Sequence, residues 1–254
     1  MKIYLAALEN QWRDVCPVLP KLTEKIYVLG SYFYIRNVAD YLSVFPYCKD
    51  FLLDSGAFSF MAGSKTTPNW DEYIESYADF INKNNIHKFF ELDIDSLVGY
   101  QRVKELRYLL ESKTNRACVP VWHISRGKEE FLRMCDEYSY VSVGGIVVRE
   151  IPADKYGIFT VLIKGAHKRG ARIHGLGFTN PKLLQKYHFD SVDSSSWGSG
   201  TRFGLVYTFA NRNITQIRFT KKERAMGMRT RTQGLNAHNF LEWVKFQKYA
   251  ETHL

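Results

Sequence analysis

Four apolar runs in this chain end in a carboxylate or in a glycine pair, and these endings constrain the fold more than any other feature. The segments are Phe51–Phe58 (FLLDSGAF), Phe89–Asp95 (FFELDID), Tyr140–Val147 (YVSVGGIV) and Phe189–Trp197 (FDSVDSSSW). A parallel α/β barrel builds its catalytic face from strand ends of this kind. We therefore expect the four segments to contribute side chains to one pocket.

Eight short apolar or β-branched runs predict strands, and most of them lack strict alternation, as is typical of strands covered on both faces. They are Lys2–Leu8, Lys25–Tyr32, Phe51–Leu53, Lys88–Leu92, Ala117–Trp122, Tyr140–Val143, Ala171–Leu176 and Phe189–Val192. Helical patterns cover Trp70–Asn84, Gly99–Ser112, Ser125–Glu137, Asp154–Arg169, Pro181–Tyr187 and Asn236–Glu251. Strand and helix in alternation predict an α/β fold, and eight strands favour a closed (β/α)8 TIM barrel in a single domain over 1–254. A doubly wound open sheet is the alternative.

Composition excludes some classes of protein. Hydrophobic residues make up 45% of the chain, enough for a large core, but the longest apolar runs are far short of the ~20 residues that cross a membrane. The apolar stretch Met1–Leu8 is too short for a signal peptide and predicts a first strand. The four cysteines have neither zinc-ligand spacing nor the pattern of a disulfide framework, so we expect a cytoplasmic protein.

The charge favours an anionic partner, because the net charge is +9. Much of the excess falls in one segment, 212–231, which holds a single acid. Its cations are Arg212, Arg218, Lys221, Lys222, Arg224, Arg229 and Arg231. This concentration predicts contacts with nucleic-acid phosphates, although a basic surface without a partner is the simpler interpretation of net charge alone.

The first two strand endings carry carboxylates. Asp54 is followed by Ser55 and Gly56, a sequence that also suits a plain Asx turn, and Phe58 could stack on a planar ligand. Asp93 and Asp95 lie two residues apart and share a face if the strand continues. Two such acids need a cation, a proton or hydrogen-bond donors, so a divalent metal site is one possibility and a helix cap at Asp95 another.

The later strand endings carry a histidine, a glycine pair and a further aspartate. His123 follows an apolar strand, and the pair Gly144–Gly145 could either form a tight turn or bring backbone close to a ligand. Asp193 precedes three serines, whose hydroxyls could hold its carboxylate ionised. An ionised, oriented carboxylate is suited to attack a sugar C1′, with a second acid such as Asp54 moving the proton. Asp190 is a rival for the nucleophile.

The order of these motifs resembles the tRNA-guanine transglycosylase superfamily over roughly residues 50–200. That family has an Asp-Ser-Gly-Gly-Phe-type motif, an acid on the next strand, a Gly-Gly-Leu-type motif and a late Asp. The matching residues here are Asp54–Phe58, Asp93, Val143–Ile146 and Asp193–Trp197.

The resemblance implies a role for each of these residues. Asp193 would be the nucleophile that displaces guanine and forms a covalent glycosyl-enzyme intermediate, and Asp54 the general acid/base. The base-binding set would be Ser55, Phe58, Asp93, His123, Gly144, Gly145 and Ile146, in which Asp93 accepts hydrogen bonds from the Watson–Crick edge, and Phe58 or Trp197 could hold a flipped base by stacking. His123 stands where the family often has an amide side chain.

Two departures from the family redirect the expected substrate. The family's Cys-x-Cys-x-x-Cys zinc module is absent from this sequence, and the chain is shorter than the tRNA enzymes. Both features resemble the phage and genomic-island branch that inserts 7-deazaguanine bases such as preQ0 into DNA. We therefore expect DNA rather than tRNA as the partner, no ATP, metal or redox cofactor, and a homo-oligomer or an accessory protein as further possibilities.

Two other functions are compatible with the sequence. A metal-dependent barrel hydrolase would use Asp93, Asp95, His123 and His174 as ligands, and a catalytically inert barrel would only bind nucleic acid. The first predicts loss of activity with EDTA. The second predicts that changing Asp193 and Asp54 has no effect.

Overall fold

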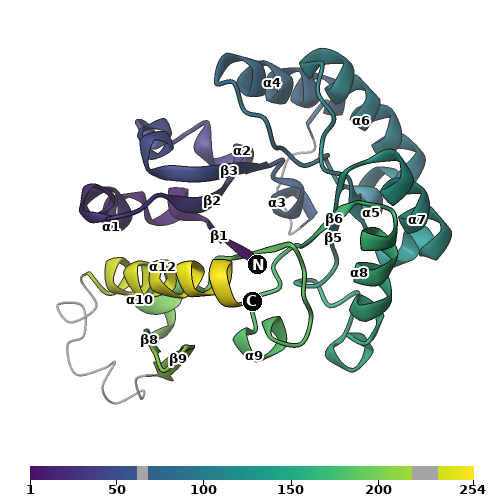
Figure 1. Ribbon diagram of the computed structural model, residues 1–254. Coiled ribbons are helices and arrows are strands. Elements are labelled where there is room, and N and C mark those ends of the chain that lie inside the picture. The colour runs from purple at the N-terminus through teal and green to yellow at the C-terminus, as the bar shows by residue number, and fades with distance from the viewer. Residues whose placement is uncertain (62–67, 219–233) are drawn as a thin grey trace. The chain divides into compact units, whose positions relative to one another are not determined.

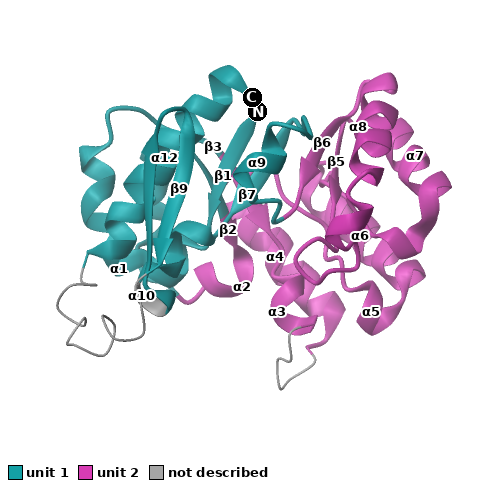
Figure 2. Cartoon of the chain, turned by 90° about the horizontal axis from the view of Figure 1, so that it is seen from below, with its two compact units in different colours: residues 1–29, 38–50, 177–254 teal, residues 30–37, 51–176 magenta. Residues whose placement is uncertain are grey.

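The computed structural model describes residues 1–61, 68–218 and 234–254, in two compact units (Figure 2). Unit 1 comprises residues 1–29, 38–50 and 177–254, and unit 2 comprises residues 30–37 and 51–176. Each unit is built from parallel strands with helices between them. No helix within the described ranges is long and apolar enough to cross a membrane.

Seven strands form one sheet in the order β3-β2-β1-β7-β6-β5-β4. Their bounds are β1 Lys2–Ala6, β2 Ile26–Ser31, β3 Cys48–Asp54, β4 Val121–Trp122, β5 Tyr140–Val143, β6 Arg172–Gly175 and β7 Ser191–Ser194. The pairing is parallel both in unit 1, where β1 lies between β2 and β7, and in unit 2, where β5 lies between β4 and β6. The predicted parallel α/β fold is confirmed at this level.

The eighth predicted strand, Lys88–Leu92, appears in unit 2 as single parallel bridges. Leu53 pairs with Phe89, and Phe90 pairs with Val119, two residues before β4. Tyr77 donates its hydroxyl to the carbonyls of Leu53 and Phe90, at 3.2 Å each. Unit 2 thus has parallel pairing from the end of β3 through the 89–90 segment to β4, β5 and β6.

The longer helices lie close to their predicted positions (Figure 1). They are α4 Trp70–Lys83, α6 Tyr100–Thr114, α7 Gly127–Glu137 and α8 Ile158–Lys168 in unit 2, with α12 Leu235–His253 in unit 1. Helix α4 buries one face, made of Tyr73, Ile74, Tyr77, Ala78 and Ile81. Two predicted starts were wrong: α7 begins at Gly127 rather than at Ser125, and α8 begins at Ile158, after a 3₁₀ turn at Ala153–Lys155.

Short helical turns fill the connections. In unit 1 they are η1 Leu8–Gln11, α1 Trp12–Val15, η2 Cys16–Lys21, η3 Tyr41–Tyr47, α9 Pro181–Leu184, η6 Ser196–Ser199 and α10 Gly200–Phe203. In unit 2 they are α2 Tyr32–Ile35, α3 Ala57–Met61, α5 Asp95–Val98, η4 Ile124–Arg126 and η5 Ala153–Lys155. Helix α9 is capped at its N-terminus by Asn180, whose side chain accepts a hydrogen bond from the Lys182 N–H at 3.1 Å.

The basic segment 212–231 begins within a β-hairpin that was not predicted from the sequence. Strands β8 (Leu205–Ala210) and β9 (Asn213–Arg218) pair in antiparallel register in unit 1. The hairpin is held by side chains of α12: Asn239 accepts from the Tyr207 N–H at 2.9 Å and donates to the Leu205 carbonyl at 2.8 Å. Glu242 accepts from the Phe209 N–H at 2.7 Å.

Helix α12 also supports the first two strands through one amide. Gln247 is 3% exposed, accepts from the Tyr27 N–H at 3.1 Å, and donates to the carbonyls of Ile3 and Tyr27 at 2.6 and 2.9 Å. Three backbone groups near β1 and β2 therefore depend on one side chain.

We expect Gln247→Leu to lower the free energy of unfolding by about 2–3 kcal/mol, because it leaves buried backbone groups without partners. Lys248→Ala, at an exposed neighbour in a surface ion pair with Glu24, should change it by less than about 1 kcal/mol. Urea unfolding followed by circular dichroism measures both. Equal stability of the two variants would contradict the role given to Gln247.

Candidate active site

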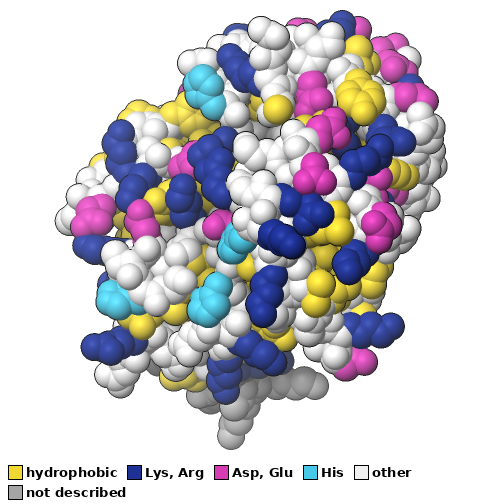
Figure 3. All heavy atoms as spheres, turned by 45° about the vertical axis from the view of Figure 1, so that its right-hand side comes forward, with side chains coloured by type: hydrophobic (Ala, Val, Ile, Leu, Met, Phe, Trp, Pro, Cys, Tyr) yellow, Lys and Arg dark blue, Asp and Glu magenta, His cyan; other side chains and the backbone are white. Residues whose placement is uncertain are grey.

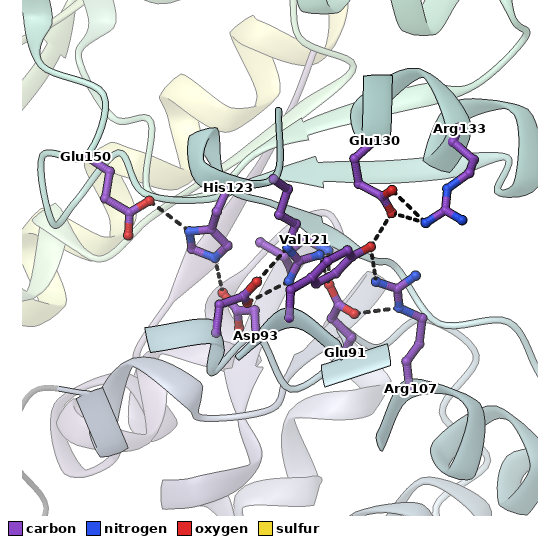
Figure 4. Close-up of polar contacts among 11 residues, drawn as sticks. Glu91, Asp93, Arg107, Val121, His123, Glu130, Arg133 and Glu150 are labelled. Carbon is purple, nitrogen blue, oxygen red and sulfur yellow. Dashed lines mark hydrogen bonds and ion pairs between the residues drawn. The ribbon is translucent and has the colours of Figure 1, made fainter. Parts of the chain in front are cut away.

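Asp93 and His123 meet in unit 2, where the parallel segments that precede them end (Figure 4). Asp93 follows the 89–92 segment and His123 directly follows β4. The His123 Nε2 lies 3.0 Å from Asp93 Oδ2, and the two residues are 5% and 6% exposed. Two residues that the sequence analysis assigned to base binding are therefore hydrogen-bonded to each other.

The other nitrogen of His123 contacts a residue that the sequence analysis did not single out. His123 Nδ1 lies 3.0 Å from Glu150 Oε2, so the ring sits between two carboxylates (Figure 4). The Glu150 N–H donates to the carbonyl of Gly145 at 2.9 Å, which turns the loop after β5 back toward β4. The available signal was an acid in the loop after the glycine pair, five residues after Gly145.

The glycine pair makes room for this arrangement. A Cβ on Gly144 would lie 2.9 Å from His123 Nε2 and 2.8 Å from Val121 Cγ1, closer than side chains pack. Gly145 has φ +73°, and a Cβ there would lie 2.6 Å from Glu150 Oε2. The Gly144 N–H is used in the ladder with Trp122, at 2.8 Å from its carbonyl. The pair thus shapes the His123 site, whether or not it also contacts a base.

The two carboxylates set the charge of His123. Burial alone lowers the pKa of His123, but the hydrogen bonds and charges of Asp93 and then Glu150 outweigh it and raise the pKa to about 9. Burial raises the pKa of Asp93, and His123 opposes that rise. A cationic imidazole beside Asp93 is therefore the expected state at neutral pH.

A second buried network lies beside this pair and rests on Glu91, which is 0% exposed. Glu91 accepts from Arg107 Nε at 2.6 Å, from Arg126 Nη1 at 2.9 Å and from the Val121 N–H at 2.7 Å. Arg126 also holds Asp95 through two bonds, at 2.8 and 2.7 Å. Neither Glu91 nor the arginines were predicted, although acids at 91, 93 and 95 share the spacing that already marked Asp93 and Asp95.

This network bears on the metal-site alternative. Asp95 is bound to Arg126 and is the first residue of helix α5. The N-cap of this helix is Ile94, with no side-chain cap hydrogen bond, so the helix-cap interpretation of Asp95 was wrong. His174 Nδ1 lies 3.4 Å from the Tyr140 hydroxyl. Across the residues that the structure describes, no three His, Cys, Asp or Glu side chains form a group that could hold a metal ion.

Asp54 ends β3 and is part of unit 2. Its Oδ2 accepts from the Gly56 N–H at 2.9 Å, so the Asx turn that the sequence allowed is present. Ser55 is fully buried, and its hydroxyl has no hydrogen-bond partner among the described residues. The Ser55 carbonyl accepts from the Tyr73 hydroxyl at 2.6 Å. Phe58 is 51% exposed, as a ring available for stacking would be.

Asp193 lies in β7 of unit 1 and is 8% exposed. Its Oδ1 accepts from the Gly177 N–H at 2.6 Å, and Gly177 has φ +72°. Ser194 uses its hydroxyl to accept from the Ser196 N–H at 3.2 Å. Asp190 is half-buried in the turn before β7, and its carbonyl accepts from the Lys2 N–H. Asp193 and Asp54 belong to different units.

One stacking assignment was wrong. Trp197 is 0% exposed, donates its Nε1–H to the Ala6 carbonyl at 2.9 Å and packs edge-to-face against Phe240. A ring buried in the core cannot stack on an incoming base. Ile146 is also mostly buried, at 7% exposed, in the loop after Gly145.

The predicted phosphate-binding cations are only partly described. Arg212 and Arg218 are exposed, on the turn and at the end of the β8–β9 hairpin. Lys221, Lys222, Arg224, Arg229 and Arg231 lie outside the described residues. On the face shown in Figure 3, Lys and Arg side chains are scattered among other types.

No protein-family model and no curated protein matches this chain.

We expect His123 to titrate near pH 9, well above its unfolded value of 6.5. Its contribution to stability should be complete below pH 6.5 and lost as the pH rises through about 9. NMR titration of the histidine rings, with His123→Gln to assign the resonance, measures the pKa. A value at or below 6.5 would contradict the ion pair with Asp93.

We expect Gly144→Ala to cost about 1–3 kcal/mol of stability and to lower the pKa of His123, because the new methyl group displaces the ring from Asp93. Gly157→Ala is the matched control: a Cβ there meets nothing within 4 Å. Thermal unfolding and the same NMR titration test both variants. A His123 pKa unchanged in Gly144→Ala would show that the glycine does not set this contact.

Proposed function

We propose that this protein is a pentosyltransferase that exchanges guanine in DNA for a 7-deazaguanine base through a covalent Asp193-linked intermediate. The observation that supports it best is the buried Asp93–His123 pair where parallel strand segments end, with His123 Nε2 at 3.0 Å from Asp93 Oδ2. The resemblance of the strand-end motifs gives the reaction type.

The Asp93–His123 pair suits recognition of a guanine-like base. A carboxylate accepts hydrogen bonds, and guanine and 7-deazaguanine present N–H donors on the Watson–Crick edge. His123 as a cation favours the ionised form of Asp93, which keeps the acid an acceptor. Glu150 positions the ring by holding its other nitrogen.

The proposed chemistry has two displacement steps. In the first, an Asp193 oxygen bonds to C1′ as the C1′–N9 bond breaks, and the departing guanine takes a proton from Asp54. In the second, the incoming 7-deazaguanine base loses its proton to Asp54, and its nitrogen bonds to C1′ and releases Asp193. The Gly177 N–H would orient the Asp193 carboxylate throughout.

The proposal extends to fold and substrate. A closed (β/α)8 barrel is supported by the bridges of Phe89 and Phe90, which stand where the eighth strand was predicted. Phage-type DNA modification, with tRNA as the alternative substrate, rests on the resemblance. The proposed reaction remakes the bond it breaks, so it requires no ATP, metal or redox cofactor.

The first test is base exchange with the purified protein. Guanine-labelled DNA and tRNA are incubated separately with and without preQ0, and the nucleosides are then analysed by mass spectrometry. We expect preQ0-dependent modified deoxynucleoside and release of guanine. Modified tRNA alone would change the substrate and retain the mechanism, whereas exchange in neither, by folded protein, would contradict the proposal.

We expect Asp193→Asn to reduce exchange by about three orders of magnitude or more and to abolish the covalent adduct, because an amide is a poor nucleophile. Asp190→Asn is the matched control, three residues earlier, and should retain activity. Denaturing gels with labelled DNA detect the adduct. If Asp190→Asn abolishes the adduct and Asp193→Asn retains it, Asp190 is the nucleophile.

We expect Asp93→Asn to lower kcat/KM for the 7-deazaguanine base by about 10- to 100-fold, the scale of a lost charged hydrogen bond. The affinity for DNA should change little, because phosphate contacts supply most of it. Exchange kinetics and fluorescence anisotropy measure the two quantities. Equal losses in both would argue against a role in base recognition.

A further inference from the structure

Unit 1 contains an open cavity of about 600 Å³ that the proposed chemistry does not use. Its walls come from the start of α9, from η6, from the β8–β9 hairpin and from α12, all within unit 1 (Figure 2). It is therefore distinct from the Asp93–His123 pair in unit 2.

The chemistry of the lining suits an anionic, hydrogen-bonding ligand. The polar side chains are Thr179, Asn180, Lys182, Ser196, Thr215 and Gln216, together with Asn213 and the Tyr207 phenol. Among the lining residues that the structure describes, none is a carboxylate and Lys182 carries the one full charge. Hydroxyls, amides and a lysine are typical of contacts to phosphate and sugar oxygens.

Trp243 gives an independent indication of a ligand. Its ring lines the cavity and is 1% exposed, yet within the described part of the chain its Nε1–H has no hydrogen-bond partner. A buried donor left unpaired costs about 1–3 kcal/mol, which an oxygen entering the cavity could offset. Apolar contact is available from Ile214 and from the indole itself.

Two wall segments of the cavity are close in sequence to Asp193 and to its hydrogen-bond partner Gly177. Thr179 follows Gly177 by two residues, and Ser196 follows Asp193 by three. A ligand in the cavity would therefore contact the chain two residues after Gly177 and three residues after Asp193.

We propose that this cavity binds the sugar-phosphate backbone of a single nucleic-acid strand, at a nucleotide adjoining the one that Asp193 attacks. The position relative to the reaction rests on the proposed function, whereas the binding of a strand rests on the cavity itself. Arg212 and Arg218, exposed on the same hairpin, would contact further phosphates.

The test measures binding without turnover, in the Asp193→Asn background. Fluorescein-labelled single-stranded DNA of ten nucleotides is titrated by anisotropy at several salt concentrations. We expect Lys182→Glu to weaken binding by about 5- to 30-fold and to reduce the salt slope by about 0.7 or more, the value for one phosphate contact on a single strand.

Lys186→Glu is the matched control. It makes the same charge change four residues away, at an exposed lysine outside the cavity lining. Its effect should be less than about twofold, because exposed charges at a distance are screened. Equal effects of the two changes would mean general attraction to a basic surface and would overturn the proposal.

Thr215→Val tests the same site without a change of charge. It removes one β9 hydroxyl, which donates to the Thr208 carbonyl at 3.3 Å in an exposed position. We expect it to weaken strand binding by a fewfold and to change the free energy of unfolding by no more than about 1 kcal/mol, the scale of one such hydrogen bond. Thr208→Val, at an exposed position on the paired strand outside the lining, is its control. If neither Lys182→Glu nor Thr215→Val weakens binding, the proposal is wrong.

Two further arms separate this inference from its alternatives. If a mononucleotide such as dTMP binds as tightly as the ten-nucleotide strand, the cavity holds a free nucleotide and not a strand. If Lys182-dependent strand binding occurs without exchange on any nucleic acid, this binding site stands and the proposed function fails. If exchange occurs and Lys182→Glu leaves KM and affinity unchanged, the proposed function stands and the proposed strand-binding site is wrong.

Discussion

The buried carboxylate of Glu91 is the interaction on which the unit 2 site depends. A buried charge is costly unless it is paired and hydrogen-bonded, and Glu91 accepts hydrogen bonds from Arg107, Arg126 and the Val121 N–H. The last bond ties the 89–92 segment to β4, the strand that carries His123 at its end. Arg126, held at the same time by Asp95, fixes the turn that follows.

Glu91 and Asp93 illustrate two uses of a buried acid on one segment. Glu91 is paired with two guanidinium groups that cannot lose their protons, so its role is to hold strands together. Asp93 is paired with an imidazole, whose proton can move and whose pKa of about 9 depends on that pairing. Glu91 therefore stabilises the packing of neighbouring segments, whereas Asp93, two residues later, raises the pKa of a titratable imidazole.

The strand positions could be predicted because parallel strands are short apolar runs: Tyr140–Val143 matches β5 at both ends. The partners of the acids could not be predicted from the sequence. The arginines that contact Glu91 lie 16 and 35 residues away along the chain, so the pairing depends on how these segments pack in the folded protein. The β8–β9 hairpin was missed because neither strand alternates strictly between apolar and polar residues and because the interpretation of that segment followed its charge. The polar residues that α12 buries, such as Gln247, leave no amphipathic signal in the sequence.

The two aspartates that carry the proposed function are held in different ways, and the difference fits their roles. Asp93 is held by an imidazole that can share a proton, which suits an acid that must match the donors of a base. Asp193 receives a bond from the Gly177 backbone N–H, which cannot surrender its proton to the carboxylate. Such a donor would orient the carboxylate oxygen for the proposed attack. Gly177 can supply it because its φ of +72° turns the chain at the end of β6, before the segment that reaches the cavity at Thr179.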